Sequence, residues 1–209
     1  MTTTEPAPTA DEADGGAGPR MPWSVLEDYR CFGCSPHNPH GIALQFTEHP
    51  EGLSTTFRLG RSYESYPGVV HGGLLGVVVD ETMGNLIVVR TGQIAFTVSM
   101  RLRYLAPVNV GAEYLCVARL GQGADGPLTS TSAEILDVHG ATVVTATASY
   151  RNVSFGVAQD RITLSAPEAT RLGQALTTAE AQHQPVPQHQ PAPQHQPAPQ
   201  HQSTTKEPQ

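Results

Sequence analysis

The chain has 209 residues, of which 38% are hydrophobic, and a formal net charge of −7 at pH 7. An acidic chain without a basic segment is a poor candidate for nucleic-acid binding, because neutralising phosphates needs an excess of Lys and Arg. Three cysteines, an odd number, and an acidic N-terminus without a basic-then-apolar leader indicate a reduced, cytoplasmic setting and no export signal.

Composition divides the chain into one globular region and two tails. Residues 1–20 are rich in Thr, Pro, Ala, Gly and acidic residues, which predicts a disordered N-terminal tail. Residues 21–155 carry the apolar pattern of a single domain. Residues 156–209 are predicted to be a C-terminal tail, which from about residue 182 repeats a hexapeptide of Gln, His and Pro. The prolines favour an extended, solvated chain over weak metal binding by the repeated histidines.

The first motif of the globular region is Cys31-Phe32-Gly33-Cys34, followed by His37 and His40. A C-x-x-C motif supplies two zinc ligands and a histidine could add another, so a zinc knuckle is one interpretation. A complete site needs four well-placed ligands, and the candidates here are crowded together. A packed turn with reduced thiols is the preferred interpretation, with no metal or other cofactor expected. Whether Cys31 and Cys34 bind a metal stays open.

Alternating apolar residues next predict two strands, at residues 41–48 and 53–59, which a Pro-Glu-Gly turn joins as a hairpin. After a connector rich in Tyr, Pro and Gly, an apolar stretch from about Gly72 to Arg90 predicts one long helix, which Thr91-Gly92 ends. Polar side chains in its middle make this stretch too polar, and slightly too short, for a membrane span. We therefore expect a helix buried in the domain and no membrane partner.

Four more strands are predicted after the helix, at residues 96–104, 114–120, 128–138 and 141–153. His139-Gly140 joins the last two as a tight turn. Two strands, one long apolar helix and four strands predict the α+β class, with an antiparallel sheet of about five to six strands wrapped around a central helix. A helix that is apolar on all sides has to be enclosed.

The carboxylate of Asp80 is the most unusual feature of the predicted helix. It lies nine residues after His71, where Gly72 and Gly73 leave the backbone N–H groups of the helix start accessible. These N–H groups and the helix dipole favour an oxyanion, and His71 could cap or orient them. Asp80 could then act on a carbonyl as a general base or a nucleophile. An ordinary turn at the glycines and a structural hydrogen bond at Asp80 are the alternatives.

Helix geometry separates these two features. Nine residues of helix advance the chain by about 13 Å, so Asp80 and Gly72 of one chain cannot hold the same small group. If both act on one carbonyl, they come from different subunits, which predicts a homodimer with its site at the interface. Glu81 is rotated about 100° from Asp80 on the helix, so we expect it to face away from the same pocket and to have a structural role.

Together these motifs resemble the hotdog-fold acyl-CoA thioesterase superfamily, in particular its PaaI-like branch. The resemblance covers most of residues 31–153 and rests on the segments 31–42, 67–73, 80–84 and 104–107. It implies a hotdog fold, in which a curved antiparallel sheet wraps a long helix, and homodimers or homotetramers built from dimers. It also implies hydrolysis of an acyl-CoA or acyl-carrier-protein thioester to the free acid and the thiol.

Carried over by position, the resemblance gives roles to five residues. Asp80 matches the catalytic carboxylate, and Gly72 with Gly73 matches the oxyanion-binding helix start. His71 matches the motif histidine, and Thr97 matches the Ser or Thr that helps to position the attacking water in several members. A non-catalytic acyl-thioester-binding protein of the same fold is the alternative function, and a hotdog dehydratase or hydratase is a weaker one.

Further residues are candidates for substrate binding. On the strand after the helix, Thr97, Ser99 and Arg101 are predicted to share the face opposite Phe96 and Val98. A solvated stripe is the default interpretation of the arginines on this face, and a cofactor phosphate partner is the alternative. Ser65 stands where many relatives have an Asn six residues before the motif histidine. The full set of substrate-binding candidates is Ser65, Val70, Thr82, Ser99 and Arg101.

Overall fold

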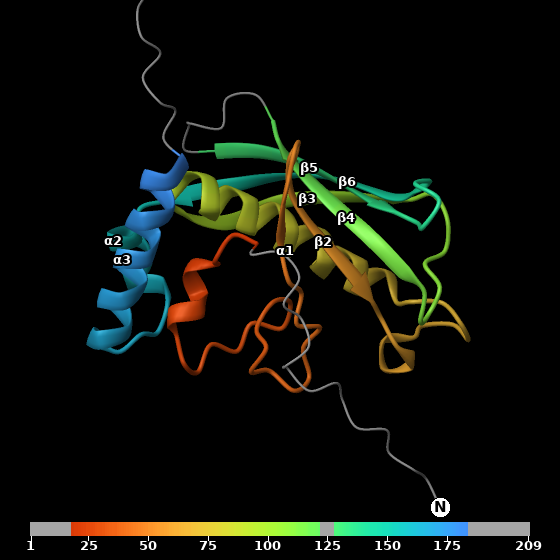
Figure 1. The fold of residues 1–209 in the computed structure, drawn as a ribbon, viewed down its shortest axis with the longest axis horizontal. Coiled ribbons are helices and arrows are strands. Elements are labelled where there is room, and N and C mark those ends of the chain that lie inside the picture. Colours follow the sequence, from red (N-terminus) through yellow and green to blue (C-terminus); the bar gives the residue numbers. More distant parts are fainter. Residues whose placement is uncertain (1–17, 122–127, 184–209) are drawn as a thin grey trace, which may run out of the picture.

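The computed structural model describes residues 18–121 and 128–183 (Figure 1). One long helix, α1 (Gly72–Thr91), lies against a six-stranded antiparallel sheet of order β1-β2-β4-β5-β6-β3. The strands are β1 (Thr47–His49), β2 (Gly52–Arg58), β3 (Ile94–Tyr104), β4 (Glu113–Leu120), β5 (Leu128–Leu136) and β6 (Thr142–Val153). The other helices are η1 (Pro22–Val25), η2 (Arg61–Tyr63), α2 (Phe155–Ala158), η3 (Gln159–Arg161) and α3 (Ala166–His183). The predicted α+β arrangement is confirmed.

Helix α1 begins and ends close to the predicted positions. The ring nitrogen Nδ1 of His71 accepts a hydrogen bond from the Gly73 N–H at 3.0 Å, which caps the start. Gly92 ends the helix with a left-handed φ of 65°. Contrary to the sequence interpretation, α1 is long and apolar enough to cross a membrane by length and composition alone. Ten of its side chains are buried inside the fold, as in the core helix of a globular domain.

The predicted hairpin is present with a shorter first strand. β1 covers only three residues, and the preceding stretch is irregular, with Ala43 at a positive φ of 49°. The backbone of this stretch bonds to the cysteine-containing turn instead, since the Ile42 N–H donates to the Phe32 carbonyl and the Leu44 N–H to the Gly33 carbonyl. The residues predicted as strand therefore hold the N-terminal turn against the domain.

Strand β3 lies at one edge of the sheet and contains a β-bulge at Val98. Thr97 pairs with Tyr150 and Ser99 pairs with Ser149, so one residue of β3 is left unpaired between them. An extra residue reverses the side-chain alternation, so Thr97 and Ser99 face opposite sides of the sheet. The prediction that Thr97 shares a face with Ser99 and Arg101 is therefore wrong, and Thr97 faces α1.

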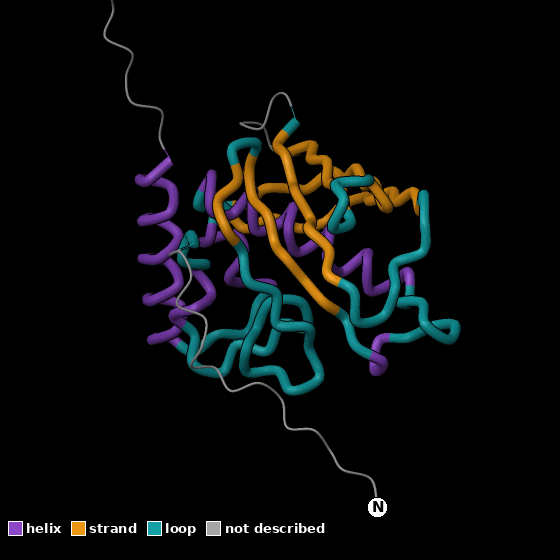
Figure 2. Tube along the Cα trace, turned by 45° about the vertical axis from the view of Figure 1, so that its right-hand side comes forward, coloured by secondary structure: helices purple, strands orange, loops and turns teal. Residues whose placement is uncertain are grey.

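The folded region extends beyond the expected boundary at residue 155. Helix α3 packs against α1 and η1, and figures 1 and 2 show it at one end of the molecule. Leu172 and Leu176 are buried in a small second core together with Leu26 and Val88. Spacings of four residues place the apolar side chains on one face of the helix. Apart from Gln182 and His183, which end α3, the Gln/His/Pro repeats lie outside the described residues, as does most of the predicted N-terminal tail.

Candidate active site

The carboxylate of Asp80 lies at a cavity of about 130 Å³ beside the middle of α1. Its Oδ1 atom accepts two hydrogen bonds, from Thr97 Oγ1 at 2.9 Å and from the hydroxyl of Tyr150 at 2.7 Å. No hydrogen bond to Oδ2 occurs within the part of the chain that the structure describes. Two donors thus fix the orientation of the carboxylate while leaving one oxygen available to a ligand.

Tyr150 is a functional candidate that the sequence analysis missed. Its ring is buried, and burial, followed by the charge of Asp80, raises the pKa of its hydroxyl far above the ordinary value of 10.0. The hydroxyl therefore stays protonated and remains a hydrogen-bond donor to the carboxylate at every working pH. Alternation along β6 places Tyr150 on the face of Ala146 and Ala148, but this pattern does not reveal which helix residue it meets.

The N-terminal segment covers the same cavity from the side opposite the sheet. Trp23 donates from its indole nitrogen to Asn85 Oδ1 at 3.1 Å and stacks on Tyr29, with ring centroids 5.8 Å apart. Glu81 lines this cavity together with Asp80, so the expectation that the two carboxylates face different pockets is wrong. The two side chains are about 100° apart around the helix axis, but the N-terminal segment is wide enough to cover both of them.

The start of α1 forms a second, separate cavity of about 370 Å³. The hydroxyl of Tyr104 donates to the Gly72 carbonyl at 3.0 Å, and a Cβ at Gly72 would lie 3.3 Å from the Tyr104 ring. The Gly73 N–H is already bonded to His71, which leaves the Gly72 N–H without a partner among the described residues. The helix start therefore offers one free backbone donor beside a cavity, as an oxyanion site requires.

The two cavities lie apart along α1. Gly72 and Asp80 are eight residues apart in one helix, which corresponds to about 12 Å. Of the residues predicted to act together, the structure joins Asp80 with Thr97 and joins His71 with Gly73, but it does not join these two pairs within one protomer. The two candidate half-sites, the helix start and the Asp80 carboxylate, thus lie at different levels of α1.

The candidate substrate-binding residues divide into three groups. Ser65 and Val70 line the cavity at the helix start, together with Gly72. Thr82 is fully buried and donates its hydroxyl to the Val78 carbonyl at 2.7 Å, so this structure shows it bonded within the helix and not at a cavity. Ser99 and Arg101 lie on the outer face of β3, away from the Asp80 cavity of the same protomer, because of the bulge.

Comparisons with known proteins agree with this geometry. Residues 67–122, which contain the helix start, Asp80 and Thr97, match the Thioesterase superfamily. No curated protein matches the chain. A crystal structure of a thioesterase superfamily protein matches with a TM-score of 0.51 and 19% identity, and the match covers 58% of this chain and 62% of that one. The chain therefore spans less than two thirds of that protein's length.

Two further solved structures are similar. A Streptococcus mutans protein bound to acetyl coenzyme A has a TM-score of 0.50 and 18% identity, over 62% of this chain and 96% of that one. The Escherichia coli PaaI protein has a TM-score of 0.48 and 15% identity, over 54% of this chain and 81% of that one. The fold is a hotdog fold. With the match over residues 67–122, the resemblance of the chain to the hotdog thioesterase superfamily is confirmed.

Proposed function

We propose that the protein hydrolyses acyl thioesters of coenzyme A or of a carrier protein, as a PaaI-like thioesterase. The observation that carries this proposal is the carboxylate of Asp80, which Thr97 and Tyr150 hold through Oδ1 while Oδ2 accepts no hydrogen bond from another described residue. A fixed carboxylate with one free oxygen suits a general base for water or a nucleophile. The acetyl coenzyme A bound by the Streptococcus mutans relative supports the substrate class.

The reaction breaks the carbon–sulfur bond of the thioester. Water loses a proton to Asp80 as its oxygen attacks the carbonyl carbon, the bond to sulfur then breaks, and the leaving thiolate takes up the proton. If Asp80 attacks directly, a mixed anhydride forms and water hydrolyses it in a second step. In both cases the carbonyl oxygen gains negative charge, which the Gly72 N–H and the positive end of the α1 dipole would stabilise.

A homodimer would bring the two half-sites together. The proposed interface is the open edge of β3, an eleven-residue strand on which Val98, Met100 and Tyr104 are exposed. A long apolar edge strand favours pairing with another chain. Gly73 is exposed at the start of α1, and Asp80 is half-buried where α1 meets β3, the edge strand. Pairing through β3 would place Gly72 of one subunit opposite Asp80 of its partner.

The test is release of free thiol from a panel of acyl-CoA and acyl-carrier-protein thioesters. We expect the wild-type protein to hydrolyse at least one of them and the Asp80→Asn variant to lose about a hundred- to ten-thousand-fold in kcat, the usual contribution of a general base. A folded Asp80→Asn protein with full activity would refute the assignment. Stoichiometric binding of acyl-CoA without thiol release would favour the non-catalytic alternative.

A further inference from the structure

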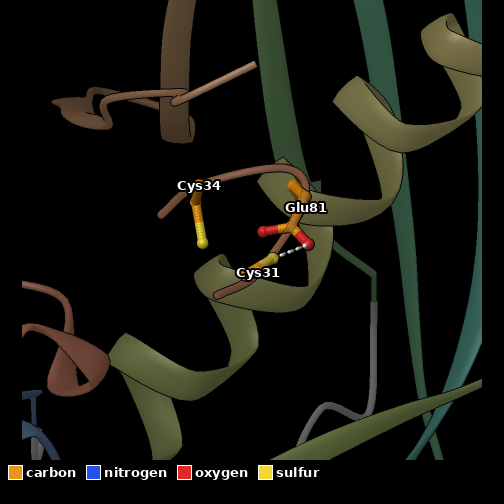
Figure 3. Close-up of side chains that lie close together, drawn as sticks. All are labelled: Cys31, Cys34 and Glu81. Carbon is orange, nitrogen blue, oxygen red and sulfur yellow. Dashed lines mark hydrogen bonds between the residues drawn. The ribbon is translucent and has the colours of Figure 1, made fainter. Parts of the chain in front are cut away.

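Besides the groups of the proposed active site, two thiols meet the carboxylate of Glu81, which lines the same cavity as Asp80. Cys31 and Cys34 come from the N-terminal turn and Glu81 comes from α1, and Figure 3 shows the three side chains directed toward one another. Their sulfur and carboxylate oxygen atoms all lie within 4.8 Å of one another. Cys31 Sγ and Glu81 Oε1 are hydrogen-bonded at 3.0 Å. Segments fifty residues apart in the chain thus bring three metal-ligating groups together.

The backbone of the turn is shaped around these groups. The Gly33 N–H donates to Cys31 Sγ at 3.3 Å. The hydroxyl of Ser35 donates to the Tyr29 carbonyl, which closes the turn. A Cβ on Gly33 would meet the Glu81 side chain at 2.2 Å, so only glycine allows the turn to approach the carboxylate this closely. Backbone donors to sulfur stabilise a thiolate, which is the form that binds a metal.

Electrostatics also favour a cation at this position. Three groups that are negative when deprotonated lie within 4.8 Å of one another. No Lys, Arg or His hydrogen-bonds to any of the three within residues 18–121 and 128–183. A divalent ion would balance the negative charge of the three groups in their metal-binding forms.

We propose that Cys31, Cys34 and Glu81 bind one zinc ion, with a water molecule as the fourth ligand. Two soft thiolates and a carboxylate form a donor set that suits zinc. Thiolates about 2.3 Å from a tetrahedral zinc ion are about 3.8 Å apart, so small side-chain rotations complete the site. A cavity of about 290 Å³ lined by Cys34, Tyr29 and His37 gives water access to the fourth position.

This site differs from the zinc knuckle with a histidine ligand that the sequence suggested. The C-x-x-C motif contributes both of its cysteines, but the third ligand is Glu81 from α1, and neither His37 nor His40 belongs to the cluster among the described residues. The ion would tie the N-terminal segment, whose Trp23 and Tyr29 cover the active-site cavity, to the helix next to Asp80. Its role in this proposal is to position that segment, independently of whether the protein is a thioesterase.

The first experiment measures the zinc content of the full-length protein, purified under reducing conditions without a histidine tag. We expect one zinc per chain in the wild type and in the matched cysteine variant Cys116→Ala, whose thiol is buried elsewhere in the core. The double variant Cys31→Ser/Cys34→Ser should lose the metal. A full-length His189→Gln/His195→Gln/His201→Gln variant should keep it, which separates the proposed site from the repeated histidines.

Cobalt(II) substitution in the wild-type protein reports directly on the type of ligand atoms. This measurement does not require a variant that folds. Cobalt bound by the wild-type protein should show a thiolate-to-metal charge-transfer band in the near ultraviolet, and Glu81→Gln should weaken its binding by at least about tenfold. Absence of the band in the wild type would overturn the proposal. Zinc retained by a folded Cys31→Ser/Cys34→Ser protein would also overturn it, as would a Cys31–Cys34 disulfide in protein kept under reducing conditions.

Discussion

Asp80 and Glu81 are adjacent carboxylates on one turn of α1, yet they have different partners. Asp80 accepts hydrogen bonds from two hydroxyl groups of the sheet, those of Thr97 and Tyr150. Glu81 meets a thiol of the N-terminal turn and the side-chain amide of Asn85. The partners of a carboxylate, rather than its position in the helix, therefore determine which chemistry it can perform.

The physical reason lies in the protons that each set of partners carries. Hydroxyl groups with a high pKa donate to a carboxylate and stabilise its charge, as Tyr150 does for Asp80. Thiols are themselves acids, so they can compete with a carboxylate for protons. Burial raises the pKa of Glu81, and the Cys31 thiol adds to this increase. The arrangement around Asp80 suits a base for catalysis, and the arrangement around Glu81 suits a site for a cation.

The largest predicted effect is that substitutions at the neighbouring residues Asp80 and Glu81 impair different properties, catalysis in one case and metal binding in the other. Asp80→Asn should lower kcat for thioester hydrolysis by about a hundred- to ten-thousand-fold and leave the zinc content at one per chain. Glu81→Gln should weaken metal binding and lower kcat by less than about tenfold, because Gln keeps the volume that fills this side of the cavity. Parallel thiol-release assays and metal analyses on the two proteins check this prediction. Equal loss of activity in both variants would mean that the two carboxylates form one site.

A smaller effect is predicted for the donor that holds Asp80. Tyr150→Phe keeps the buried ring but removes the hydrogen bond to Asp80 Oδ1. A hydrogen bond to a charged group contributes about 1.5–3 kcal/mol, which corresponds to roughly ten- to a hundredfold in kcat if it acts mainly on the transition state. We expect KM to change little, since the ring does not reach the helix-start cavity. A raised KM with unchanged kcat in steady-state kinetics would contradict this role.

Much of the helix and its chemistry could be predicted from the sequence. Gly92, at a left-handed φ, ends α1 next to its predicted last residue, and His71 caps its start as proposed. These features follow from local backbone rules, so the residue types at the ends of the helix are enough to predict them. The resemblance to a family singled out Thr97 as a residue that helps to position water, but its hydrogen bond to Asp80 comes from the structure. The alternation of apolar residues by itself put Thr97 on a shared face with Ser99, which the bulge contradicts.

The remaining features depend on contacts between distant segments. Nothing in the sequence near Glu81 indicates that Cys31 will meet it, because the approach depends on how the irregular stretch before β1 folds back on the turn. Helix α3 was missed because its apolar stripe, with Leu172 and Leu176, is narrow and surrounded by polar residues. Such a stripe gains stability only from packing against α1, which a local pattern does not report.

A change in the N-terminal turn should separate the two carboxylates with less effect on catalysis. Gly33→Ala would place a Cβ 2.2 Å from the Glu81 side chain, so the turn and the carboxylate have to move apart. Such overpacking costs about 1–3 kcal/mol, and we expect metal affinity to fall by at least about fivefold. Competition with a chromogenic zinc chelator measures the affinity. The matched control is Gly60→Ala, at a position where a Cβ meets nothing within 4 Å. Unchanged zinc affinity in folded Gly33→Ala would contradict the packing argument.

The smallest effect is predicted on the outer face of β3. Ser99 follows the bulge and pairs with Ser149, so it points away from the carboxylate that Thr97 holds. Ser99→Ala should therefore change kcat by less than about twofold, since substitutions away from buried contacts cost little. Thr97→Val, two positions earlier, removes a donor to Asp80 and should lower kcat by about tenfold or more. Steady-state thiol release from the two variants makes the comparison. A larger effect of Ser99→Ala than of Thr97→Val would contradict the prediction. The sheet face that the bulge gives to each side chain would then not determine its effect on kcat.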